Sequence, residues 1–152
     1  MQLKRNKDIQ RIPGFSLIEL MAVLVLLSIL VTLVFPSYQS SIKRTKRAEA
    51  WAMLMKGMQQ QERHYSMYGR YVNFSASDPQ GFSWHSGSTP EGSAYEIRAE
   101  ACEGHALTQC IMLLAQPGTP KVQSGYQDQE CGTLSLDSTG ARKAAGNGKS
   151  CW

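Results

Sequence analysis

The chain is organised around Pro13-Gly14-Phe15-Ser16-Leu17-Ile18-Glu19 and the apolar run that follows it, residues 20–35. Of the 21 residues from Phe15 to Phe35, only Glu19 is charged. A helix of this length measures roughly 30 Å at about 1.5 Å per residue, which is enough to cross the hydrocarbon core of a bilayer. The sequence therefore predicts a membrane-spanning helix close to the N-terminus.

A short basic segment precedes the apolar run and contains Lys4, Arg5, Lys7 and Arg11. It predicts that the N-terminus stays in the cytoplasm while the remainder is exported. An ordinary secretory signal is cut after a shorter apolar core, whereas the only processing-like junction here, Gly14/Phe15, precedes the run. Cleavage at this junction removes a leader, residues 1–14, and keeps the anchor, residues 15–36.

Glu19 is unusual because it places a carboxylate inside an apolar helix. Insertion scales assign about 2.5–3.5 kcal/mol to such a charge at the centre of a membrane helix. A cost of this size calls for a partner or a function. The α-amine that cleavage creates on Phe15 is the nearest candidate cation.

These features together resemble the class III signal of type IV pilins, in which a prepilin peptidase cuts after the glycine and N-methylates the following phenylalanine. Gly14, Phe15 and Glu19 occupy the three motif positions, and Pro36-Ser37-Tyr38 matches the Pro-x-Tyr that closes the family's apolar stretch. The resemblance implies an α+β fold of the type IV pilin kind. In that fold the apolar half of a long N-terminal helix lies in the membrane or in the filament core.

Residues 37–152 suffice for one small head domain. The helix is expected to continue to about residue 67, because residues 37–65 contain one glycine, Gly57, and no proline. Gly69 is the expected stop. One face of this helix is predicted to pack on a sheet, from apolar and aromatic residues at steps of three and four: Trp51, Leu54, Met55, Met58, Glu62 and Tyr65.

Residues 72–94 are rich in Ser, Gly, Pro and Asp and are predicted to form an ordered loop. An antiparallel sheet of about four strands is expected within residues 95–152. Alternation predicts a half-buried strand at 95–101, and the apolar segment 110–115 predicts a second. A third is expected within 131–140 and a short fourth at 141–145.

The cysteines Cys102, Cys110, Cys131 and Cys151 all follow the anchor, which indicates an oxidising compartment and two disulfides. Their spacing fits no compact zinc motif. If the first two strands form a hairpin, Cys102 and Cys110 lie near its closed end, which leaves Cys131 with Cys151. The block from Cys131 to the final Cys-Trp also resembles the C-terminal disulfide-bounded loop of Gram-negative minor pilins related to the major subunit.

The formal net charge of +4 lies mainly near the membrane. The leader contributes +3, and residues 66–152 contain six basic and eight acidic side chains. The dense basic cluster Lys43, Arg44, Lys46 and Arg47 is interpreted as a solvated face that meets lipid headgroups or neighbouring subunits. Nucleic acid is therefore an unlikely partner, although Arg142, Lys143 and Lys149 could form a local basic patch.

Catalysis finds little support, because His64, His85 and His105 are scattered and no nucleophile, base and acid share a motif. We expect no enzyme activity, no catalytic residue, no cofactor and no metal site. The resemblance instead implies a minor pilin that helps initiate assembly or sits at the pilus tip, supporting twitching motility and adhesion. The implied partners are a prepilin peptidase, the major pilin and other minor pilins.

The resemblance also implies a location. A single-pass subunit stays in the inner membrane with its head in the periplasm, and after assembly it belongs to an extracellular pilus. Two alternatives remain open. A pseudopilin of type II secretion shares the signal and often binds calcium, for which Asp128, Glu130 and Asp137 are few and separated. A DNA-uptake (competence) pilin needs a basic, aromatic-bearing stripe on the head.

Overall fold

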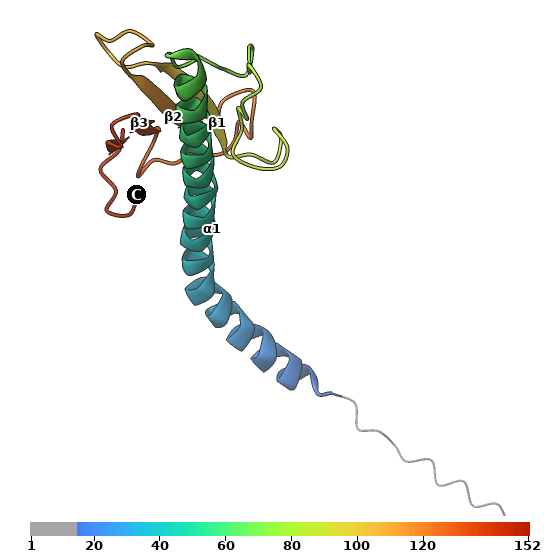
Figure 1. Cartoon of the computed structure of the whole chain (residues 1–152). Helices are drawn as coiled ribbons and strands as arrows, with labels where there is room; N and C mark the ends of the chain where they lie inside the picture. The colour runs from blue at the N-terminus through green and yellow to red at the C-terminus, as the bar shows by residue number, and fades with distance from the viewer. Residues whose placement is uncertain (1–14) are drawn as a thin grey trace, which may run out of the picture. The chain divides into compact units, whose positions relative to one another are not determined.

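The computed structural model describes residues 15–152, apart from the side chains of Leu33, Val34 and Pro36 (Figure 1). The predicted leader, with Gly14, lies outside the described residues. The described elements are one helix and four strands: α1 (Leu17–Tyr68), β1 (Tyr95–Ala101), β2 (Ile111–Pro117), β3 (Leu134–Asp137) and β4 (Arg142–Ala144). The chain divides into two compact units, one ending at Gln39 and the other, the head, beginning at Ser40.

The N-terminal part of α1 exposes apolar side chains on all sides. Phe15 is 89% exposed and Leu17 is 77% exposed, and even Leu27, further along, is half exposed. By length and composition, α1 could cross a membrane. A helix that is apolar all round needs an apolar environment, which either lipid or other helices can supply.

The C-terminal end of α1 is closed by Gly69, as expected. Gly69 has a φ of +69°, and its N–H donates to the carbonyl of Tyr65 over 2.8 Å. This left-handed cap is available to glycine at little cost. The chain then turns under the buried Gln61, whose side-chain amide donates to the Val72 carbonyl over 2.6 Å and accepts from the Val72 N–H over 2.9 Å.

The four strands form an antiparallel meander in the order β1-β2-β3-β4. Leu113 in the middle of β2 lies opposite Ala99 of β1 and Leu136 of β3. The sheet packs on the C-terminal half of α1. The chain thus has the α+β architecture expected from the sequence, with a long N-terminal helix, four antiparallel strands and a disulfide-bounded C-terminal region.

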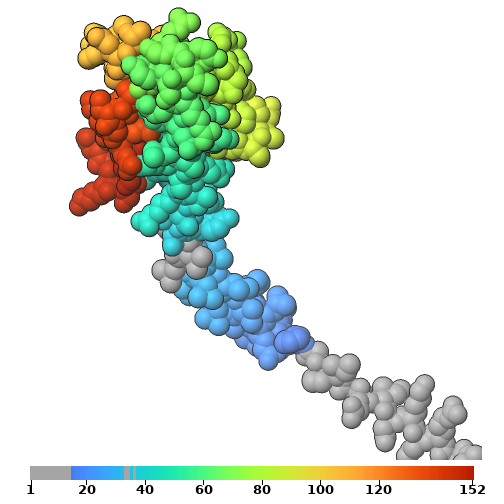
Figure 2. Space-filling view, in the orientation of Figure 1, coloured from blue at the N-terminus to red at the C-terminus, as the bar shows by residue number. Residues whose placement is uncertain are grey.

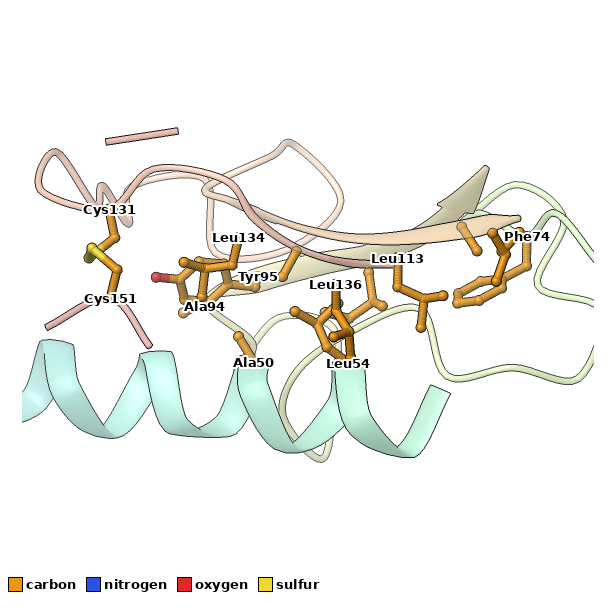
Figure 3. Close-up of a cluster of buried hydrophobic side chains, with 14 of the residues drawn as sticks. Ala50, Leu54, Phe74, Ala94, Tyr95, Leu113, Cys131, Leu134, Leu136 and Cys151 are labelled. Carbon is orange, nitrogen blue, oxygen red and sulfur yellow. A yellow bond between two sulfur atoms is a disulfide. The ribbon is translucent and has the colours of Figure 1, made fainter. Parts of the chain in front are cut away.

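The core of the head lies between α1 and one face of the sheet. Figure 3 shows Ala50 and Leu54 of α1 directed towards Tyr95, Leu134 and Leu136. Each of these five side chains is at most 3% exposed. Burying a leucine-sized side chain stabilises the fold by about 1.5–3 kcal/mol, so this layer is the main source of the head's stability.

The predicted apolar stripe on α1 is wrong in two positions. Met55 is 44% exposed and Glu62 is exposed, whereas Ala50, Gly57 and Gln61 are buried. The helix approaches the sheet at its smallest residue, because a Cβ on Gly57 would lie 2.7 Å from Cδ2 of Leu113. A stripe defined by large apolar side chains leaves out Ala50 and Gly57, whose small size lets the helix lie close to the sheet.

Residues 72–94 form a loop beside β1. Isolated antiparallel bridges join Phe74 to Ala99 and His85 to Glu96. The ring of Phe74 stacks on Phe82 with centroids 4.7 Å apart. The loop therefore covers the edge of β1 that faces away from β2. In Figure 2 this yellow-green loop and the red C-terminal residues lie on opposite sides of α1 in the head.

Candidate functional sites

Glu19 lies in the first turn of α1, where it accepts a hydrogen bond from its own backbone. Its Oε2 receives the N–H of Ser16 over 2.9 Å. Ser16 directly precedes the first helical residue, and its carbonyl accepts from the N–H of Leu20. Glu19 therefore supplies the carboxylate half of a capping box, and its charge lies at the positive end of the helix dipole.

Glu19 thus caps its own helix, a role that its position in the sequence does not reveal. The carboxylate has a second oxygen, and within residues 15–152 the Ser16 N–H is its one hydrogen-bond donor. Phe15, which is almost fully exposed, lies next to this cap in the chain. The arrangement leaves Glu19 able to accept a further donor from outside the chain.

The two disulfides join Cys102 to Cys110 and Cys131 to Cys151, with Cα atoms 5.4 Å apart in each pair. These are the pairs named from the sequence. The first lies at the connection between β1 and β2. The second links the residues before β3 to the C-terminus across a separation of 20 residues, and on a chain-entropy estimate it contributes roughly 3 kcal/mol.

A buried ion pair connects α1 to the loop before β3. The Nε and Nη2 of Arg47 donate to the two carboxylate oxygens of Asp128, each over 2.7 Å, and Nη2 also donates to Glu130 over 2.7 Å. Asp128 accepts further bonds from the Tyr95 hydroxyl at 2.6 Å and the Cys131 N–H at 3.2 Å. The fully buried carboxylate of Asp128 thus accepts from four donor groups: Nε and Nη2 of Arg47, the Tyr95 hydroxyl and the Cys131 N–H.

The pKa of Asp128 reflects this environment. Burial opposes its charged form, but the hydrogen bonds from Arg47 and Tyr95 outweigh burial and lower the pKa to about 2. Burial and the bond to Asp128 raise the pKa of Tyr95. Asp128 is therefore ionised and Tyr95 neutral at every physiological pH, and the network persists in one protonation state.

The interpretation of the basic cluster as a solvated face is wrong for Arg47, which is 5% exposed. Its position on the buried side of α1 and the carboxylate of Asp128 explain the difference. Lys46 pairs with Glu49 over 3.1 Å. Among the residues described, Lys43 and Arg44 are the members of the cluster without a carboxylate partner.

The loop carboxylates considered for calcium are engaged by protein donors. Asp128 and Glu130 accept from Arg47, while Asp137 accepts from the amides of Thr139 and Ala141 in the turn between β3 and β4. Within the described part of the chain, no three His, Cys, Asp or Glu residues are placed to hold a metal ion together. The carboxylates serve the packing of the head.

The three histidines each use Nδ1 for a backbone carbonyl: His64 for Arg70, His85 for Gly87 and His105 for Glu103, all over 2.9 Å. The Ser93 Oγ lies 3.4 Å from the His85 Nδ1. Its hydroxyl already donates to the Thr89 carbonyl and accepts from the Gly87 N–H, so it makes structural hydrogen bonds within the loop. The contacts of His64 and His85 order the end of α1 and the loop that follows it, and the contact of His105 lies in the connection between β1 and β2.

An aromatic cluster lies where α1 meets the C-terminus. The guanidinium carbon of Arg142 is 4.0 Å from the ring centroid of Trp51, and the ring of Trp152 meets Trp51 edge-on at 4.6 Å. Beside them is a hollow of about 450 Å³. Its lining residues are Arg44, Arg47, Ala48, Trp51, Ser150, Cys151 and Trp152. Sequence patterns had assigned Trp51 to the core and Arg142 to a separate patch.

Two family models match the chain. One, described as "Type IV minor pilin ComP, DNA uptake sequence receptor", matches residues 36–135, which is 100 of the 152 residues. The other, described as "Prokaryotic N-terminal methylation motif", matches residues 10–35. The two matches are contiguous, and together they include the apolar run, α1, β1, β2 and the first two residues of β3.

A solved structure described as "High-Resolution Structure of a Type IV Pilin from Shewanella oneidensis" is 31% identical to this chain. The alignment covers 72% of this chain and 97% of that chain, with a TM-score of 0.46. No curated protein matches the chain.

Proposed function

This chain belongs to the family of type IV minor pilins, and from that premise we propose that it enters a type IV pilus through its N-terminal helix and helps to initiate assembly at or near the tip. The role is structural and non-enzymatic. The observation that carries the proposal is the N-terminal part of α1, which exposes apolar side chains on all sides and lies within the match to the methylation motif.

Before assembly, the apolar helix and the motif fit anchoring in a membrane. We propose the inner membrane, with the head in the periplasm, because the basic residues precede the apolar run. Processing by a prepilin peptidase after Gly14 removes the leader and leaves a methylated amine on Phe15. The same helix then leaves lipid and packs among the helices of other pilins.

Glu19 sets the axial position of the subunit in this proposal. Its carboxylate pairs with the Phe15 amine of an adjacent subunit, while one oxygen continues to cap its own helix through Ser16. A buried charge that lacks its partner costs several kcal/mol, so an offset arrangement of the helices is strongly disfavoured. Apolar packing drives entry into the filament, and the charge pair selects one register.

A strain deleted for this gene tests the role in initiation. If the subunit initiates assembly, the deletion abolishes surface pili and twitching while the major pilin is still made and processed. Complementation with the unmodified gene restores both. Normal numbers of pili in the deletion strain would refute initiation and leave an accessory role in adhesion.

DNA uptake is a second candidate function, supported by the family description and by the aromatic and arginine residues beside Trp51. The excess of acidic over basic side chains in residues 66–152 is unfavourable for DNA binding. That count leaves out Arg44, which lies before residue 66, and it includes Asp128 and Glu130, whose charges are paired with Arg47. Net charge over a segment is therefore a poor guide to the charge of one face. Binding of labelled DNA by the full chain, measured across salt concentrations, tests this candidate.

A further inference from the structure

We propose that the Trp corner, defined as Arg44, Trp51, Arg142 and Trp152, binds a DNA strand, with backbone phosphates on the two arginines and a base or sugar against Trp152. The inference rests on the second candidate function and names the site for it. Three properties support the assignment: the placement of the four side chains, their unpaired positive charge and their exposed aromatic surface.

The placement follows from α1 and one disulfide. Arg44, Ala48 and Trp51 are spaced by four and three residues, so they lie on one face of the helix. Arg44 precedes Trp51 by about two turns, or roughly 10 Å along the axis. The Cys131–Cys151 bridge holds the residue next to Trp152, and Trp152 meets the Trp51 ring at 4.6 Å. The hollow is thus bounded by a helix on one side and a tethered tail on the other.

The charge of the corner is positive and available. In the described range, Arg44 and Arg142 form no ion pair with a carboxylate. Arg47 also lines the hollow, but Asp128 and Glu130 hold it on the other side. The Glu130 side chain is 62% exposed and, together with the buried Asp128, offsets the positive charge of Arg47. The two unpaired arginines are therefore the groups that can receive an anion.

Arg142 is oriented for such an anion. Its guanidinium carbon lies 4.0 Å from the centroid of the Trp51 ring, a contact that restricts the side chain, while the residue stays exposed. Arginine in this state binds phosphate oxygens with two parallel hydrogen bonds. Because the contact with Trp51 already restricts the Arg142 side chain, less rotamer freedom is lost when a phosphate binds.

Trp152 adds a contact that a free anion cannot use. It is 37% exposed although its edge is packed on Trp51. Aromatic side chains of this kind stack on bases with little sequence preference, since every base has a π face. In DNA, phosphates that arginines can bind alternate with sugars and bases that a tryptophan ring can contact. This combination favours DNA over a small anion as the ligand.

The test uses the full mature chain in detergent micelles, with fluorescence anisotropy of a short labelled single-stranded DNA over a range of salt concentrations. Arg44→Gln should weaken DNA binding about 5-fold or more and reduce the slope of log affinity against log salt by about 1. Trp152→Ala should weaken binding about 5-fold or more with little change of that slope. Arg63→Gln is the matched control, because Arg63 is another exposed arginine on α1, 19 residues further along, and it should leave binding unchanged.

Three outcomes would overturn the assignment, and each has a distinct meaning. If the unmodified chain binds DNA and both corner variants bind equally well, the site is wrong while DNA uptake stands. If the unmodified chain does not bind DNA at all, both proposals fail. If Arg44→Gln leaves DNA binding by the full chain intact but weakens its binding of glycerol phosphate, the anionic part of a lipid headgroup, the corner serves lipid headgroups instead.

Discussion

Arg47 and Asp128, which are 81 residues apart in the sequence, form a buried pair with two hydrogen bonds of 2.7 Å. The pair joins the helix that continues from the assembly segment to the loop that leads into β3. Because Asp128 also accepts from the N–H of Cys131, the same carboxylate orders the beginning of the C-terminal disulfide loop. The Trp corner is built on this loop, so the ion pair connects the filament helix to the proposed binding surface.

Asp128→Ala should lower the free energy of unfolding by about 3 kcal/mol, because it leaves the buried Arg47 with only the exposed Glu130 as a partner. Denaturant titration followed by tryptophan fluorescence measures the loss, since Trp51, Trp84 and Trp152 all lie in the head. The double variant Arg47→Met with Asp128→Leu is the control and should recover more than half of the loss. A single variant as stable as the unmodified chain would show that the pair is dispensable.

The same pair predicts a pH dependence. The folded pKa of Asp128 is about 2 and its ordinary value is 3.8, so the ionised group contributes its full stability above about pH 4. As the pH falls from about 4 towards 2, the carboxylate of the unfolded chain takes up a proton that folding must then release, so the contribution, about 2 kcal/mol, is lost. The stability difference between the unmodified chain and Asp128→Asn should therefore shrink across this window. A constant difference from pH 5 to pH 2 would contradict the shift.

Regular side-chain patterns made much of the fold predictable. The alternation in residues 95–101 and the apolar segment after Cys110 gave the first two strands, because one face of each packs on α1. The apolar run gave the N-terminal helix, since no other structure satisfies so many backbone groups without water. In each of these elements, residues close together in the sequence follow one repeating pattern of burial.

The remaining features depend on contacts between distant residues. Asp128 lies in a polar loop, and nothing in its neighbours indicates that its carboxylate is buried. Trp51 has helical spacing that fits a core residue, but Arg142 covers its ring from the short edge strand β4. The free-energy cost of a carboxylate in an apolar helix indicates from the sequence that Glu19 is functional. Its hydrogen bond from the Ser16 N–H is visible only in the structure of the helix start.

Gly57→Val tests the close approach of α1 to the sheet. The added Cβ would lie 2.7 Å from Cδ2 of Leu113, so the Leu113 side chain must shift within the core. Overpacking of this kind destabilises by about 1–3 kcal/mol. Lys56→Val places the same side chain one position away, where the helix is exposed, and should change stability far less. Equal effects of the two changes would contradict the close packing of Gly57 against the sheet.

Gly14→Val should leave the leader attached, because a bulky side chain obstructs the approach of a peptidase to the junction before Phe15. The chain should accumulate in the membrane with its basic leader intact, visible as a larger product in an immunoblot. N-terminal sequencing of the unmodified protein checks the position of the cut. A mature chain that begins elsewhere than at Phe15 would refute the proposed junction.

The most direct test of assembly through Glu19 is the amount of subunit in sheared pili, measured by immunoblot for the unmodified chain, Glu19→Ala and Glu19→Gln. Glutamine keeps an oxygen that can cap the Ser16 N–H but removes the charge that pairs with the Phe15 amine. Both variants should be processed and present in the inner membrane, and both should be missing from pili, because a buried amine without its partner costs about 3–5 kcal/mol. Recovery of either variant in pili at the unmodified level would contradict assembly through the charge pair.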